Sequence, residues 1–374
     1  MRILATAGDI DSLIAEIRLR RPLEALAHER GWALQWRSFH DCRPAELAAA
    51  DVLIVQRGLS RRVLRLQQRA LCAGAAVVYE IDDLLTEIAP HISQHDVVRA
   101  GLPWLKRCLA SADLATFSTA RLQHELAPLA RASAVVPNHA FFDEDLPLAP
   151  QRPGEPVHLL VAASEHMLVD TLAAALAPLL GPRVRLVVVG PPADALAARG
   201  LPLERHAPMP RSAFVALARR LPNAVALIAL ESSRFASCKS AIKWFDYAEI
   251  GIPTLASAVP PYLDVIAHGR TGWLVEGGPA QWLEAVRRAI EDAEGRRRVA
   301  EAARAEVRAR HGFAQTVAAW HAALLQARRL RAARSVPVQR GLAAWGQRAG
   351  DAAADWGVAL RRWNRARLAR RRRT

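Results

Sequence analysis

The stretch NAVALIALESSRFASCKSAIKWFDYAEIGIPTLAS, residues 223–257, carries the pattern that decides the fold. It contains one apolar run at 224–229 and a second one at 254–256. Between the two runs the sequence predicts a helix over 239–250, which Gly251 would end because glycine suits a helix C-terminus. Short apolar runs joined by a helix predict parallel strands in a sheet that is buried on both faces.

The same alternation of apolar runs and helical patterns extends through both halves of the chain. A proline-rich, charged stretch, FDEDLPLAPQRPGEP, interrupts it with the composition of a linker. We therefore predict an α/β protein with two Rossmann-like, doubly wound domains that face a cleft. The predicted parts are an N-terminal domain at 1–141, a linker at 142–156, a C-terminal domain at 157–333 with closing helices at 279–310 and 313–333, and a tail at 334–374.

The predicted strands follow directly from the apolar runs. In the first domain they are 2–5, 33–36, 52–55, 76–79, 114–117 and 134–136, and in the second they are 157–162, 184–189, 224–229, 254–256 and 273–275.

The positive charge is concentrated at the C-terminal end. The chain of 374 residues has a net charge of +15. Residues 328–374 alone hold 14 arginines and two acids, a balance of +12, which leaves +3 for all the others. The body of the protein therefore gives no indication of a polyanion-binding surface.

The four cysteines are widely separated and none has CxxC spacing, so neither a zinc site nor a disulfide framework is indicated. The sequence shows no signal peptide and no apolar run of about 18 residues. We expect a cytoplasmic protein, with no metal and no cofactor.

Lysine is the rarest cation in this chain. Only three of the 51 basic residues are lysines, and two of these, Lys239 and Lys243, lie four residues apart. On the predicted helix they share a face with Asp246, and the free N–H groups of a first helical turn attract anions. We predict that Lys239, Ser240 and Lys243 bind a diphosphate, while Asp246 accepts hydrogen bonds from ribose or sugar hydroxyls. The alternative is an amphipathic helix with a solvated basic face.

A second group of candidates is the acidic triplet Glu80, Asp82 and Asp83, which follows the predicted strand at 76–79. Three acids within four residues repel one another, which a purely structural role rarely requires. They could bind sugar hydroxyls, act as a general base or hold a cation. The alternative is that Asp82 or Asp83 caps the next helix.

The run KSAIKWFDYAEIGIPTLASAVPPYLDVIAHGRTGWLV, residues 239–275, resembles the donor-binding motif of the large, mostly retaining GT-B glycosyltransferase family often called group 1. A subgroup that acts in bacterial surface polysaccharide assembly carries Lys-Ser-x-x-Lys before Glu-Tyr. This chain matches it with Asp246 in place of the glutamate, followed by Tyr247. The resemblance also covers the Tyr-Glu-Ile-Asp-Asp stretch at 79–83. One position departs from the family, because Cys238 stands where the first of two acids is usual.

The resemblance implies transfer of a hexose or deoxyhexose from a nucleotide-diphosphate sugar to a glycan or lipid-linked glycan, without a metal and with retention of configuration. The implied donor-binding residues are Lys239, Ser240, Lys243, Asp246, Tyr247, Ser257, Glu165 and His166. The implied acceptor-binding residues are Gly8, Arg57, Glu80, Asp82, Asp83, Asn138 and His139. The catalytic candidates are Asp82, Asp83 and Lys243.

Several of these assignments have alternatives. Asn138 could simply form a turn, and the loop with Glu165 and His166 could only cap a helix. A non-catalytic relative that binds a glycan or a partner glycosyltransferase would explain Cys238. A nucleotide-sugar 2-epimerase would instead use Glu165 and His166 at the sugar.

The tail has a helical pattern over 338–368 in which Trp345, Trp356 and Trp363 share one side and arginines lie opposite. This is typical of a helix that lies on an anionic membrane surface, and it predicts peripheral attachment to the inner face of the plasma membrane. The alternatives are a disordered basic tail and a nucleic-acid arm. We do not expect a nucleic acid as a partner.

Overall fold

The structure, a computed structural model, describes residues 1–140, 147–163 and 167–334. These residues form two compact units. The first unit comprises Met1–Thr86, Gln94–Val136 and the described residues from Val317 on, and the second comprises Glu87–Ser93 and Pro137–Thr316. Within the described ranges, no helix has the length and the apolar character needed to cross a membrane.

The first unit contains a six-stranded sheet in the order β2-β1-β3-β4-β5-β6, and all neighbouring strands are parallel. Its strands are β1 (Arg2–Ala7), β2 (Ala33–Ser38), β3 (Val52–Gln56), β4 (Ala76–Ile81), β5 (Leu114–Phe117) and β6 (Ser133–Val135). Its helical segments are α1 (Leu13–Ala15), the π-helical η1 (Glu16–Arg20), α2 (Arg21–Arg30), α3 (Pro44–Ala49), α4 (Arg61–Cys72), η2 (Leu85–Glu87), α5 (His95–Ser111), α6 (Ala120–Leu126), η3 (Ala127–Leu129) and most of α14 (Phe313–Ala333).

The second unit contains a parallel six-stranded sheet in the order β12-β11-β10-β7-β8-β9. Its strands are β7 (Val157–Ala162), β8 (Val184–Val189), β9 (Glu204–His206), β10 (Val225–Ile228), β11 (Thr254–Ser257) and β12 (Trp273–Val275). Its helices are α7 (Val169–Leu176), α8 (Pro192–Ala197), α9 (Arg211–Ala218), α10 (Arg234–Ser237), α11 (Ile242–Ile250), α12 (Pro279–Glu291) and α13 (Ala293–Arg310).

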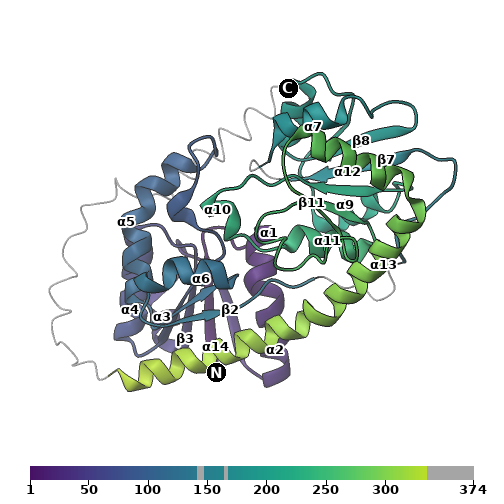
Figure 1. The fold of residues 1–374 in the computed structure, drawn as a ribbon. Coiled ribbons are helices and arrows are strands. Elements are labelled where there is room, and N and C mark those ends of the chain that lie inside the picture. The colour runs from purple at the N-terminus through teal and green to yellow at the C-terminus, as the bar shows by residue number, and fades with distance from the viewer. Residues whose placement is uncertain (141–146, 164–166, 335–374) are drawn as a thin grey trace. The chain divides into compact units, whose positions relative to one another are not determined.

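Helices cover both faces of the second sheet, as Figure 1 shows for α7 and α12 on one face and α9 and α11 on the other. Each face has its own apolar cluster. Trp282 of α12 is fully buried in one cluster, and Trp244 of α11 is fully buried in the other. The predicted α/β class with two Rossmann-like sheets is therefore confirmed.

Each predicted apolar run coincides with a strand, but the sequence did not predict β9. This three-residue strand lies at the edge of its sheet and consists of glutamate, arginine and histidine. Because an edge strand needs no apolar face on both sides, β9 left no hydrophobic signal.

The assignment of the helix at 313–333 to the second domain was wrong for most of its length. From Val317 on, α14 belongs to the first unit. The indole Nε1 of buried Trp320 donates to the carbonyl of Arg18 at 2.9 Å, and Arg334 pairs with buried Asp113. The periodicity of the sequence predicts that one side of α14 is apolar. It does not show which of the two units that side packs against.

The predicted linker is a packed segment where the structure describes it. The Ala149 N–H donates to the carbonyl of Ile250 at 2.9 Å, and the side chain of Asn223 donates to the carbonyls of Arg152 and Glu155. Leu148 packs at Gly251, the left-handed C-cap of α11 with φ +79°. These contacts attach the described residues 147–156 to the second unit, whose longer segment begins before the predicted linker, at Pro137.

Substitution of Gly251 by alanine should strongly destabilise the second unit. The new Cβ would lie 2.4 Å from Cδ2 and 2.9 Å from Cα of Leu148. We expect a loss of about 2–4 kcal/mol, from the left-handed backbone and from overpacking together. Gly31 is the matched control, since it caps α2 at φ +65° with no neighbour within 4 Å of its Cβ position. Urea denaturation should show a clearly smaller loss for Gly31→Ala, and equal losses would contradict the role of Leu148.

Candidate functional site

The candidate donor-side residues surround the point where the strand order of the second sheet reverses. The strands β7 and β10 lie next to each other there, and the chain leaves them toward opposite edges of the sheet. Ligands of doubly wound sheets bind at the carboxyl ends of the strands at such a switch point. The segment with Lys239, Ser240 and Lys243 follows β10 directly, so the topology places these residues at that end of the sheet.

The helix in this segment begins later than the sequence predicted. The residues after β10 first form the single turn α10, whose Ser233 hydroxyl accepts from the Ala236 N–H at 3.1 Å. A turn follows, and α11 begins only at Ile242. Lys239 and Ser240 therefore lie before the helix, and Lys239 does not share a helical face with Lys243. Ser233 caps the separate short helix α10, and the residues between α10 and α11 form a turn. The predicted helix therefore lacks its first three residues.

The N-terminus of α11 has the features of an anion site. Its N-cap, Ala241, provides no side-chain cap for the free N–H groups of the first turn. Lys243 lies in that first turn, and among the described residues no carboxylate pairs with it. The Lys239 ammonium lies 4.5 Å from the centre of the Phe235 ring, just before the helix. Two cations thus flank a helix N-terminus.

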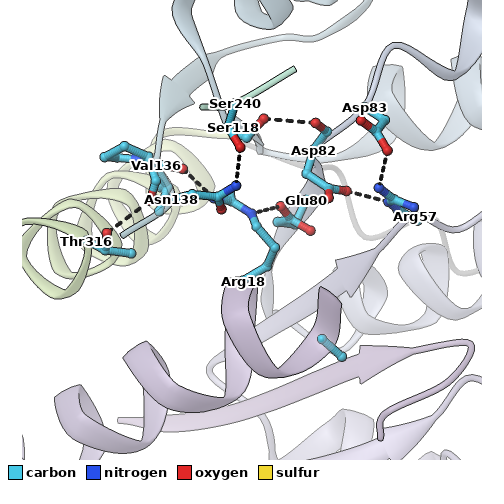
Figure 2. Close-up of polar contacts among 12 residues, drawn as sticks. Arg18, Arg57, Glu80, Asp82, Asp83, Ser118, Val136, Asn138, Ser240 and Thr316 are labelled. Atoms are coloured by element: carbon cyan, nitrogen blue, oxygen red, sulfur yellow. Dashed lines mark hydrogen bonds and ion pairs between the residues drawn. The ribbon is translucent and has the colours of Figure 1, made fainter. Parts of the chain in front are cut away.

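Asn138 contributes to this donor side, whereas the sequence placed it with the acceptor residues. It belongs to the second unit, and its Nδ2 donates to the Ser240 hydroxyl at 2.6 Å (Figure 2). Its neighbour His139 is buried, with Nδ1 3.0 Å from the Ala140 carbonyl and the ring edge-on to Phe313. His139 therefore packs in the interior of the second unit, and its predicted role in binding the acceptor is not supported.

Asp246 lies beside Arg211, an arginine that the sequence did not predict as part of the site. The Nε atom of Arg211 is 3.5 Å from Oδ1 of Asp246, and the same guanidinium pairs with Glu249. Burial raises the pKa of Asp246, while Lys243 and then Arg211 act to lower it. The signal that could have revealed this group is Glu249, an acid in the otherwise apolar end of the predicted helix.

Tyr247 and Ser257 are both buried. The Tyr247 hydroxyl accepts the N–H of Ala162 at 3.1 Å, which fixes the end of β7, and burial raises its pKa. The Ser257 hydroxyl lies at the end of β11 and has no hydrogen-bond partner among the described residues. Cys238 is likewise buried. Glu165 and His166 lie outside the described residues.

In the first unit, Arg57 joins the ends of two neighbouring strands. Arg57 follows β3 and has a left-handed backbone, with φ +49°. Its side chain pairs with Asp82, and its Nη2 donates to Asp83 at 2.6 Å (Figure 2). Its N–H donates to the carbonyl of Glu80 at 2.9 Å, which continues the β3–β4 ladder. Through these ion pairs the structure brings together three of the predicted acceptor residues. The two acids among them are partly exposed.

Glu80 is not open to a ligand, contrary to the prediction. Its side chain is fully buried and pairs with Arg18, whose Nε donates at 2.7 Å (Figure 2). Burial raises the pKa of Glu80, and the charge of Arg18 opposes that shift. Arg18 lies in the π-helical segment η1, and it also donates to the carbonyl of Val136 at 2.7 Å. The repulsion within the acidic triplet is thus relieved by two arginines that the sequence places far away.

The remaining acceptor candidate, Gly8, follows β1 and is exposed. A Cβ atom there would meet Phe39 only at ordinary van der Waals distance. The structure therefore does not require glycine at this position, and its acceptor role stays a prediction. In the part of the chain that the structure describes, no three histidine, cysteine or acidic side chains are grouped so as to hold a metal ion.

Comparisons with known proteins agree with this architecture. Residues 166–322 match a family model described as glycosyl transferase-like. No curated protein sequence matches the chain. The structure is similar to that of HepE from Anabaena in complex with UDP and glucose, with 16% identity, coverage of 87% of this chain and 99% of HepE, and a TM-score of 0.62.

Two further solved structures are similar over most of their length. Sucrose-phosphate synthase from Thermosynechococcus elongatus has 16% identity and a TM-score of 0.59, with coverage of 88% of this chain and 98% of that enzyme. The lipopolysaccharide outer core galactosyltransferase WaaB has 13% identity and a TM-score of 0.56, with coverage of 87% and 99%. These similarities show the fold, which is the two-domain Rossmann-like GT-B fold.

Proposed function

We propose that this protein is a glycosyltransferase that moves a hexose or deoxyhexose from a nucleotide-diphosphate sugar to a hydroxyl of a glycan or lipid-linked glycan. One observation carries the proposal. The region that matches the glycosyl transferase-like model contains an uncapped helix N-terminus with Lys243 in its first turn and Lys239 just before it. Such a site suits the diphosphate of a donor.

In this proposal Lys239 and Lys243 neutralise the charge that develops on the leaving diphosphate, which is electrostatic stabilisation of the transition state. Asp246 orients the donor through its hydroxyls. Asp82 and Asp83 position the acceptor hydroxyl, and their ion pairs with Arg57 favour this holding role over proton removal. We propose a reaction without a metal and with retention of configuration, in which the donor phosphate takes the acceptor proton.

The similar structures support the choice of donor and the cellular setting. HepE was crystallised with UDP and with UDP-glucose, and WaaB is a lipopolysaccharide galactosyltransferase. We propose a related role in the assembly of bacterial surface polysaccharide. The enzyme would act in the cytoplasm, with the basic tail at 334–374 attached to the inner face of the membrane.

A panel of nucleotide-sugars tests the proposal. Calorimetry should detect binding of at least one of UDP-glucose, UDP-galactose, GDP-mannose and dTDP-rhamnose. Free nucleoside diphosphate should then appear only when a glycan acceptor is present. Binding followed by release of UDP and an epimerised sugar without acceptor would favour the 2-epimerase instead.

A non-catalytic relative is the second candidate, because buried Cys238 stands where the resembling family has an acid. The panel also separates this candidate from the enzyme. The absence of binding to every nucleotide-sugar would favour a protein that binds a glycan or a partner enzyme, and it would contradict the proposed donor site.

A further inference from the structure

Asp246 carries a buried oxygen atom that makes no hydrogen bond within the described ranges of the chain. This atom, Oδ1, has essentially no accessible surface. Its contact with the Arg211 Nε at 3.5 Å is an ion pair and not a hydrogen bond. Buried polar atoms are nearly always hydrogen-bonded, so an oxygen of this kind needs an explanation. The charge of the Arg211 guanidinium beside it supplies one, and the 17% of the Asp246 side chain that stays exposed remains open to a ligand.

Arg211 reaches Asp246 from another helix. It is the first residue of α9, and its side chain extends to α11, where Glu249 and Asp246 lie one turn apart. The two helices are in contact through the rings of Phe214 and Tyr247, with centroids 6.1 Å apart. The position of Arg211 is therefore defined by a packed helix pair.

The number of charges argues against a purely structural ion pair. Glu249 is fully buried, and Arg211 alone would neutralise it. Asp246, with 17% of its side chain exposed, adds a second carboxylate to the same guanidinium. Lys243, one turn earlier on α11, adds a further cation beside Asp246. Asp246 thus lies between two cations, at the edge of the site where the donor would bind.

We infer that Arg211 is a positioning residue of the donor site, which is anchored by Glu249 and holds Asp246 so that the exposed part of the Asp246 side chain accepts a hydroxyl of the nucleotide-sugar. The hydroxyl belongs either to the ribose or to the transferred sugar. This inference rests on the proposed function, because it requires a nucleotide-sugar at this site. Arg211 thus affects donor binding only by holding Asp246, and it does not contact the diphosphate.

A double-mutant cycle tests this action. The full-length variants are Arg211→Lys, Asp246→Asn and the double variant, and the probes are UDP and UDP-glucose in calorimetry. Arg211→Lys keeps a cation for buried Glu249 but lacks the planar fork that holds two carboxylates, so the protein should stay folded. We expect each single variant to weaken binding about tenfold or more. The double variant should bind within about twofold of Asp246→Asn alone, because the two residues act as one unit.

The two probes locate the hydroxyl. A loss of affinity already with UDP identifies the ribose, and a loss only with UDP-glucose identifies the transferred sugar. Arg296→Met is the matched control, since Arg296 is also a buried arginine of the second unit but donates to the backbone carbonyls of Ala289 and Ile290. We expect this control to bind both probes like the parent protein.

Three outcomes would overturn the inference. Losses that multiply in the double variant would mean that Arg211 contacts the donor itself. An unchanged affinity in Arg211→Lys would mean that the arginine only supports the fold. An unchanged affinity in Asp246→Asn would mean that Asp246 accepts no hydrogen bond from the nucleotide-sugar. A parent protein that binds none of the nucleotide-sugars in the panel would instead overturn the proposed function, and the inference with it.

Discussion

Replacement of Lys243 by alanine is expected to reduce turnover at least about 10²- to 10³-fold, with the fold intact. Lys243 lies in the first turn of α11, where a side-chain cap is absent and where no described carboxylate lies within ion-pair distance. Its ammonium group is therefore available to the leaving diphosphate, and its loss removes charge stabilisation that is largest in the transition state.

The measurement is the initial rate of nucleoside diphosphate release with donor and acceptor present, together with the urea denaturation curve. Lys106→Ala is the matched control, because Lys106 is an exposed lysine on α5 in the other unit. We expect the control to retain full activity. A Lys243→Ala variant with parental turnover would refute the assignment of the diphosphate site.

The largest effect on stability is expected for Arg18→Met. This change leaves the carboxylate of Glu80 fully buried without its cation, and it also removes the hydrogen bond to the carbonyl of Val136. Removal of one partner of a buried ion pair costs about 3–5 kcal/mol. We expect a loss of that size in the free energy of unfolding, measured in urea at pH 7.

The second-site variant Arg18→Met/Glu80→Leu should recover most of the lost stability, because two apolar groups can replace a buried ion pair at little cost. The pH dependence distinguishes the two variants. Without Arg18, burial raises the pKa of Glu80 in the folded protein above its value in the unfolded chain, so the folded state binds the proton more tightly. The single variant should therefore lose stability as the pH rises above about 4–5, relative to the double variant. Parallel pH curves for both variants would argue against an unpaired Glu80.

Local patterns in the sequence predicted the sheets. Each buried strand left an apolar run, since a strand covered by helices on both faces needs apolar side chains along its whole length. The central strands β3 and β4 show this best, because every residue in them is buried. The edge strand β9 left no such run, because it is short and charged.

The candidate donor residues were also accessible to sequence reasoning. The scarcity of lysine in the chain distinguishes Lys239 and Lys243 from the other cations, and Gly251 correctly predicted the end of α11. The start of that helix was wrong by three residues, because Ser233 begins a separate turn that periodicity does not distinguish. Where a helix starts in such a segment depends on the hydrogen bonds that form in the folded protein, here those after Ser233 and after Ala241.

The sequence by itself determined the α/β class, the two sheets and the segment that carries two lysines beyond β10, because these depend on patterns within a few neighbouring residues. Only the tertiary structure decided which charges meet. Arg18 reaches Glu80 across 62 positions, Arg57 reaches Asp82 across 25, and Arg211 reaches Glu249 across 38. Buried carboxylates require a cation at contact distance, and the chain can supply it from any element that the fold brings near. A sequence lists the possible partners, and packing selects among them.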